Sequence, residues 1–136
     1  MGFYARWALP SAGVLLALAT IAGALGAHTL PGHLSAGNLA VYDTAVRYQF
    51  YHSLGLLVMG VLLRGLHPDD LTAQKRMAVQ SFVSAPRALL SGIVLFCGSL
   101  YALSLGAPSW VGIVTPLGGV LLIGGWLFFA YYIWRL

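Results

Sequence analysis

The chain has 136 residues, of which 60% are hydrophobic and only 7% are charged, and its formal net charge is +4. A soluble domain carries about a quarter charged residues, so seven Lys or Arg and three Asp or Glu side chains are too few to cover a soluble surface. The single cysteine, Cys97, excludes an intramolecular disulfide and any CxxC motif. The cations are scattered along the chain, so we expect no nucleic-acid partner. The composition predicts an all-α membrane protein in contact with the lipid bilayer.

The first predicted element is a transmembrane helix over residues 7–27, which carry no charge. About 20 apolar residues cross the hydrocarbon core, because a helix rises ~1.5 Å per residue through ~30 Å. Ala19, Gly23 and Ala27 recur at every fourth position, which indicates a helix-packing face. Arg6 and the small residues that end this stretch also imitate a secretory signal. Its cleavage would leave three spans, and that alternative stays open.

The second predicted span covers residues 46–64, bracketed by Arg47 and Arg64. These arginines can extend to opposite interfaces, so a short uncharged stretch suffices for a crossing. Asp43 lies one helical turn before Arg47 and is its expected partner. Residues 28–46 are expected to form a loop.

The next stretch begins with a predicted turn at Pro68-Asp69-Asp70, and residues 71–84 are mildly amphipathic. They predict a helix that lies at the interface or extends the third span inward. Pro86, near the start of that span, fits either a first helical turn or a kink.

Residues 88–134 carry no charge. One helix of that length would measure ~70 Å, so the chain must turn back, and residues 106–109 (Gly-Ala-Pro-Ser) are the expected turn. The third and fourth spans are therefore predicted at residues 86–105 and 109–135. The fourth helix either starts at Ser109 with a kink at Pro116, or starts at Pro116.

Four spans place the N-terminus, the loop 64–87 and the C-terminus on one side of the membrane. The opposite side carries one cation, Arg47. The side with the termini carries six: Arg6, Arg64, Lys75, Arg76, Arg87 and Arg135. The positive-inside rule then predicts a four-helix bundle with both termini in the cytoplasm.

Several segments resemble a known family. They are residues 23–28 (GALGAH), 42–52 (YDTAVRYQFYH), 96–101 (FCGSLY) and 115–119 (TPLGG) with 124–126 (GGW). In this order they are similar to the uncharacterised family of small four-span membrane proteins that includes bacterial YgdD and YwdK and animal transmembrane protein 256. The resemblance covers nearly the whole chain and implies a multi-pass protein of the bacterial inner membrane. It implies no reaction or ligand. Cys97 and Arg47 depart from the serine and glutamine common in the family.

The polar side chains that could carry chemistry gather on the predicted second span. Thr44, Tyr48 and His52 follow i, i+4, i+8 spacing, and Gln49 adjoins their face. His28, just beyond the first span, would meet His52 if these helices pack. Two imidazoles there could bind a metal ion or a haem, with His33 and Asp43 as weak candidates for further ligands. A proton or small-ligand role is a further alternative. We favour the alternative that this polar cluster makes structural hydrogen bonds and holds no cofactor.

Small residues elsewhere indicate packing. Gly98 and Ser99 on the third span and Gly118 and Gly119 on the fourth allow close helix approach, while an irregular Gly118-Gly119 backbone that lines a cavity is the functional alternative. Cys97 is expected to be an apolar filler.

Three functions remain open. We favour a non-enzymatic membrane protein that packs with itself, as a homo-oligomer, or with a larger membrane complex. The second is an outward-facing metal or cofactor site at His28 and His52, and the third is a small oligomeric channel or transporter. No acidic residue lies mid-span, which disfavours proton-coupled antiport, and no catalytic motif supports an enzyme.

Overall fold

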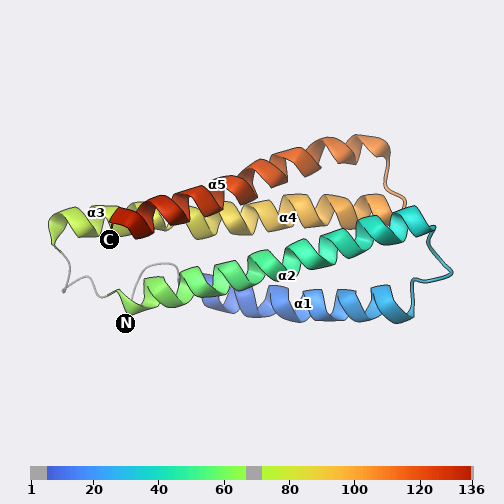
Figure 1. Ribbon diagram of the computed structural model, residues 1–136, viewed down its shortest axis with the longest axis horizontal. Coiled ribbons are helices and arrows are strands. Elements are labelled where there is room, and N and C mark those ends of the chain that lie inside the picture. The colour runs from blue at the N-terminus through green and yellow to red at the C-terminus, as the bar shows by residue number, and fades with distance from the viewer. Residues whose placement is uncertain (1–5, 67–71, 136) are drawn as a thin grey trace.

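The computed structural model describes residues 6–66 and 72–135, and within these ranges the chain is helical and contains no strand. A short helix, α3 (Ala73–Phe82), precedes the third long helix, and a 3-10 helix, η2 (Ser109–Ile113), precedes the fourth. The predicted all-α class with four long helices is confirmed. Those helices run along the long axis of the molecule (Figure 1): α1 (Ala8–His28), α2 (Ala36–Gly65), α4 (Ser84–Ser104) and α5 (Val114–Arg135).

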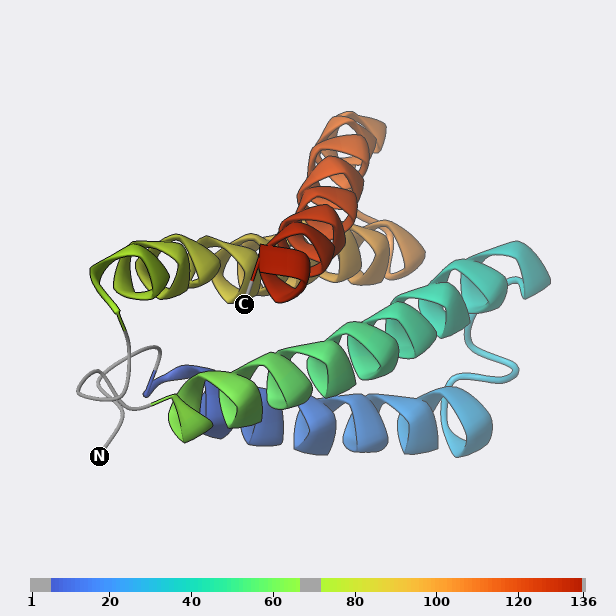
Figure 2. The same ribbon diagram turned by 60° about the vertical axis from the view of Figure 1, so that its left-hand side comes forward.

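The long helices pack in a series with α2 and α4 at its centre. The most extensive contacts join α1 to α2, α2 to α4, and α4 to α5. Figure 2 shows α1 and α5 on opposite sides of this arrangement. The core follows the two central helices, where Leu56, Met59, Leu63 and Leu89 are fully buried. The outer helices α1 and α5 therefore leave much of their surface uncovered.

Helix α2 begins earlier than the predicted span. The side chain of Ser35 accepts a hydrogen bond from the backbone N–H of Asn38 at 3.2 Å, which satisfies one of the free donors at a helix start. The helix therefore begins at Ala36, and most of the loop predicted at 28–46 is helical. The sequence pattern identified only the uncharged part of α2 and not its first turns.

The predicted reversal between α4 and α5 is confirmed. Gly106 adopts a φ of +99°, the left-handed conformation that glycine tolerates best. Its N–H donates to the carbonyl of Leu103 at 3.2 Å, and the N–H of Ala107 donates to the carbonyl of Ala102 at 2.9 Å. This pair of bonds is the Schellman motif that closes many helices.

Two prolines lie in first helical turns. Pro86 lies just after the break at Val83 that separates α3 from α4, so it occupies the first turn of α4. The chain after the reversal is a 3-10 helix from Ser109 and an α-helix from Val114, which places Pro116 in the first turn of α5. The turn predicted at residues 68–70, and residue 71 of the predicted interfacial helix, lie outside the described residues.

Three helical stretches are long and apolar enough to cross a membrane. They are Ala8–His28, Ala73–Ser104 and Ser109–Arg135. Helix α2, with 30 residues, is long enough but is not among them.

Candidate functional site: a polar network across three helices

Gln49 occupies the centre of a polar network inside the helix assembly. It lies in the middle of α2 and is 5% exposed. Its side-chain Nε2 donates to the backbone carbonyl of Leu15 on α1 at 2.9 Å. The hydroxyl of Tyr101 on α4 donates to its Oε1 at 2.8 Å. One amide therefore links three helices.

Tyr42 continues the network two helical turns before Gln49. Its hydroxyl donates to the backbone carbonyl of Ala22 on α1 at 2.9 Å. Its ring meets the ring of Tyr101 edge to face, with centroids 5.1 Å apart. A Cβ on Gly26 would lie 3.0 Å from the Tyr42 ring, so the glycine makes room for the tyrosine. Two hydrogen bonds, from Tyr42 and from Gln49, thus join α2 to α1.

The network joins α1, α2 and α4 to one another through hydrogen bonds. A buried polar group without a partner is costly in a low-dielectric interior, and a fully bonded one fixes the packing. Gln49, Tyr42 and Tyr101 each use their polar atoms on another helix. They include no carboxylate or imidazole, the groups that most often act as general acid or base. The arrangement favours a structural role.

A groove of about 470 Å³ lies between α1 and α4, over the network. Tyr42, Gln49 and Tyr101 contribute to its lining, together with Cys97 and Gly98 from α4. The rest of the lining is aliphatic: Leu15, Leu18, Ile21, Ala22, Leu25, Ile93, Val94 and Leu105.

The polar cluster predicted on α2 divides between two faces. Gln49 points into the network, whereas the ring of Tyr48 lies 4.9 Å from that of Phe96 on α4 and stacks on His52 at 5.5 Å. The Nδ1 of His52 donates to the carbonyl of Tyr48 at 2.7 Å, and its ring lies 6.2 Å from that of Trp126 on α5. Tyr48 and His52 thus belong to an aromatic contact between α2, α4 and α5.

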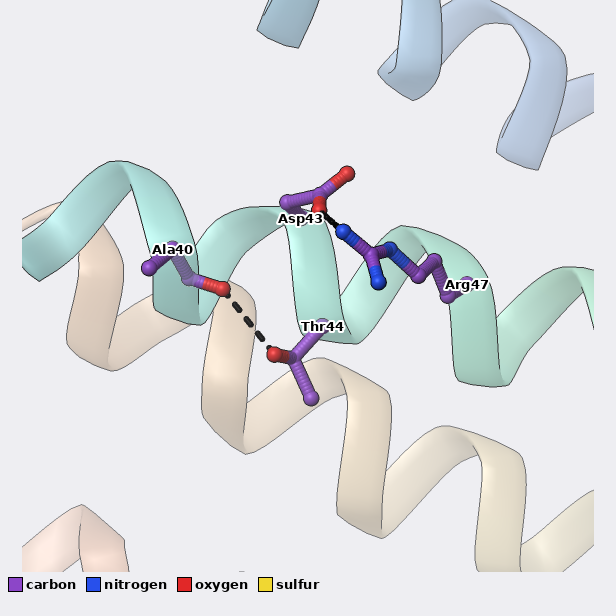
Figure 3. Close-up of polar contacts among 4 residues, drawn as sticks. All are labelled: Ala40, Asp43, Thr44 and Arg47. Atoms are coloured by element: carbon purple, nitrogen blue, oxygen red, sulfur yellow. Dashed lines mark hydrogen bonds and ion pairs between the residues drawn. The ribbon is translucent and has the colours of Figure 1, made fainter.

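Thr44, the fourth residue of that cluster, bonds within its own helix. Figure 3 shows its hydroxyl turned back to the carbonyl of Ala40, to which it donates at 2.9 Å. In the same view Arg47 reaches Asp43, and the predicted ion pair is confirmed. Both charged side chains are more than half exposed (64% and 51%), so we expect the pair to contribute little to stability.

The structure does not bring His28 and His52 together. The bonds from Tyr42 to Ala22 and from Gln49 to Leu15 set an antiparallel register that places His28 opposite the start of α2. His52 then lies roughly 24 Å further along the helix, at ~1.5 Å per residue. Among the described residues no group of three or more His, Cys, Asp or Glu side chains forms a metal-ligand set. His33 lies in the turn between α1 and α2.

The packing residues predicted on α1 differ in their surroundings. Ala19 is buried, and a Cβ on Gly23 would lie in ordinary contact with Val46 of α2, at 3.5 Å. Ala27 is exposed. Ala19 and Gly23 therefore face protein, whereas Ala27 does not.

Helices α4 and α5 approach each other closely. A Cβ on Gly118 would lie 2.3 Å from the backbone nitrogen of Phe96, and one on Gly119 would be in ordinary contact with the Phe96 ring at 3.7 Å. The Ser99 hydroxyl lies 2.7 Å from that of Thr115, which joins the same two helices. Gly98 meets no other helix, since a Cβ there would find nothing within 4 Å. Gly118 and Gly119 lie within the regular α-helix α5, so the alternative of an irregular backbone that lines a cavity is wrong.

Sequence reasoning missed the two tyrosines of the network. Tyr42 and Tyr101 were recognised as parts of family motifs and not as partners of Gln49. The spacing of Tyr42 and Gln49, seven residues apart on one helix face, was a usable signal. Tyr101 lies on another helix, and no pattern in one sequence connects it with Gln49.

Comparison with known proteins gives the family. The model of the family described as "Protein of unknown function (DUF423)" matches residues 22–119. Similar proteins include the UPF0382 membrane protein YwdK of Bacillus subtilis, 42% identical over 110 residues that cover 81% of each chain. A UPF0382 membrane protein of Haemophilus influenzae is 37% identical over 109 residues, 80% of this chain and 78% of the relative. The UPF0382 inner membrane protein YgdD of Escherichia coli is 35% identical over 104 residues, 76% of this chain and 71% of the relative. No solved structure matches the chain. The chain therefore belongs to this family of membrane proteins of unknown function, as the resemblance of its motifs predicted.

Proposed function

We propose that this chain is a non-enzymatic protein of the bacterial inner membrane that crosses the bilayer four times and associates through α1, with copies of itself or with a larger membrane complex. The observation that carries the association is an exposed line of small residues on the outer face of α1. The four crossings and the orientation rest on separate observations.

The surface of α2 supports a fourth crossing. Tyr51, Val58 and Val61 are 59%, 52% and 57% exposed, and no charge lies between Arg47 and Arg64. Exposed side chains of this kind suit lipid, and the polar residues Gln49 and Ser53 of the same stretch are buried inside the protein. The uncharged stretch measures roughly 24 Å at ~1.5 Å per residue, and the flanking arginines can extend to the two interfaces.

The arrangement of the helix ends supports an orientation with both termini inside. Helix α1 begins and helix α5 ends at the same end of the molecule in Figure 1, where α2 ends and α3 lies. The α1–α2 and α4–η2 turns lie at the other end. Six cations belong to the first end, and Arg47 belongs to the second, so the positive-inside rule favours cytoplasmic termini.

The outer face of α1 supports association. Gly13, Ala17, Thr20 and Ala24 follow spacings of four, three and four residues and are all exposed. Such spacing aligns them along one face, where small side chains let a second helix approach closely. The Thr20 hydroxyl donates to the carbonyl of Leu16 at 2.9 Å, so the face presents no unsatisfied donor.

Cysteine cross-linking in native membranes tests the association. The sole cysteine is buried, so Cys97→Ser provides a background for introduced thiols. We expect Ala17→Cys to form a cross-linked dimer on oxidation and Val120→Cys, 67% exposed on α5, to form little. Gly13→Leu should abolish the Ala17 cross-link by blocking close approach. Equal cross-linking at both sites, or a monomer free of partners in mild detergent, contradicts the proposal.

The other parts of the proposal have their own tests. Reporter fusions at the two ends should both give cytoplasmic signals, and opposite signals would refute four crossings. Elemental analysis and visible spectra of the purified protein, beside His28→Ala and His52→Ala, test the predicted metal site. Flux assays in reconstituted vesicles test the predicted channel.

A further inference from the structure

A cleft of about 520 Å³ separates α3 from the C-terminal part of α5. Gln74, Lys75 and Ser81 line it from α3, and Tyr131, Tyr132 and Arg135 line it from α5. Phe82 of α3 packs against Phe129 and Tyr132, with ring centroids 5.8 and 6.0 Å apart. These ring contacts hold the two walls in place.

The charges that the described residues contribute to the cleft have one sign. Among these residues its lining holds two cations, Lys75 and Arg135, and no carboxylate. Among the described residues neither Lys75 nor Arg135 forms an ion pair, and the Arg135 guanidinium lies 5.2 Å from the centroid of the Tyr131 ring. Asp43 is the one acidic side chain in the described part of the chain, and it pairs with Arg47 far along α2. The cleft is therefore complementary to an anion.

The surroundings of the cleft are those of a membrane interface. The exposed side of α5 next to it is apolar and aromatic, with Leu127 65%, Phe128 46% and Trp134 85% exposed. Aromatic side chains of this kind favour the headgroup level of a bilayer, with aliphatic ones below them. Helix α3 projects beyond α4 at the same end of the molecule (Figure 1). An anion bound here would lie at headgroup depth, with apolar surface beneath it for acyl chains.

We propose that the cleft between α3 and α5 binds the phosphate-bearing headgroup of an anionic phospholipid through Lys75 and Arg135. The hydroxyls of Ser81, Tyr131 and Tyr132 on its walls are further donors to phosphate oxygens. Basic pockets between membrane helices are known to hold such headgroups, and the apolar face of α5 below the cleft favours a lipid over free phosphate. This site requires only membrane location and is independent of how the chain associates.

The full-length protein in nanodiscs tests the proposal. Native mass spectrometry would compare retention of phosphatidylglycerol and cardiolipin with that of phosphatidylcholine. We expect Lys75→Gln with Arg135→Gln to lower the preference for anionic lipid roughly 10- to 30-fold, because each cation near the surface contributes severalfold. The matched control, Arg64→Gln with Arg87→Gln, removes the same charge from the same end of the molecule and should change it little.

Each other outcome overturns the proposal. An equal loss in both double variants would show that surface charge attracts the lipid without a site. Unchanged binding in the Lys75 and Arg135 variant would show that the cleft is not used, as would follow if Asp69 or Asp70, outside the described residues, neutralised it. Displacement of the lipid by millimolar inorganic phosphate would assign the cleft to a soluble anion. Lys75 and Arg135 are exposed, so the double variant should fold, and its helical content by circular dichroism would check this.

Discussion

Replacing Gln49 by leucine should destabilise the helix assembly, because one side chain links three helices. The substitution keeps the approximate size of the side chain and removes two hydrogen bonds, to the Leu15 carbonyl and from the Tyr101 hydroxyl. Interhelical hydrogen bonds in membrane proteins contribute about 0.6 kcal/mol on average and up to about 1.7. The loss of two predicts a decrease of roughly 1–3 kcal/mol in the free energy of unfolding.

Reversible unfolding by dodecyl sulfate in mixed micelles, followed by tryptophan fluorescence, measures this change. The matched control is Gln80→Leu, since Gln80 is exposed on α3 and should alter stability by less than about 0.5 kcal/mol. A double-mutant cycle with Tyr101→Phe isolates the bond between Tyr101 and Gln49. Its coupling free energy should be about 0.6–1.7 kcal/mol.

The reasoning would be refuted if Gln49→Leu were as stable as the unmodified protein, or more so. A coupling free energy near zero, with both single variants destabilised, would show that the two side chains act separately. In that case the short distance between them would not reflect a stabilising contact.

Three further predictions concern packing and backbone, each measured in the same unfolding assay. Gly118→Ala places a Cβ against the Phe96 backbone and should lower the free energy of unfolding by roughly 1–3 kcal/mol. The matched variant Gly119→Ala should be neutral or slightly stabilising, because alanine favours helix. Equal effects of the two variants would contradict the close approach of α4 and α5. Ser53→Ala removes a buried hydroxyl that has no hydrogen-bond partner among the described residues, so it should be neutral or stabilise by up to about 1 kcal/mol, and a clear loss would reveal a partner. Gly106→Ala should cost roughly 1–2 kcal/mol because the residue has a positive φ, and an unchanged stability would mean that the turn adopts another conformation.

The elements of the fold followed from local signals. The uncharged stretch from residue 88 to 134 is too long for one crossing, and the Gly-Ala-Pro-Ser segment within it is a strong turn signal, so the reversal at residue 106 could be placed. The start of α2 was harder, because Ser35 caps a helix whose first turns are not apolar enough to resemble a span. Hydropathy indicates which part of a helix suits lipid. It does not show whether the helix continues beyond that part.

The candidate site could be predicted only where its partners share a helix. The ion pair of Asp43 with Arg47 followed from their spacing of four residues. Tyr42 and Gln49 share a face for the same reason, but the contact with Tyr101 depends on how α4 packs against α2. The contact of Gly55 also depends on how the helices pack. A Cβ on Gly55 would lie 2.6 Å from the Trp126 ring of α5, and no local sequence pattern predicts this contact.

The network also explains why α2 has a weak hydropathy signal although we propose it as a crossing. Hydropathy averages every side chain of a helix, as if all of them faced lipid. Helix α2 has neighbours on two sides, and its buried residues include Tyr42, Gln49 and Ser53, which lower the average while they face protein. The residues that face outward, such as Val58 and Val61, are apolar. A helix whose buried face is polar is therefore the one that composition alone is most prone to overlook, whereas α4, which is equally central, lies within a stretch apolar enough to be recognised.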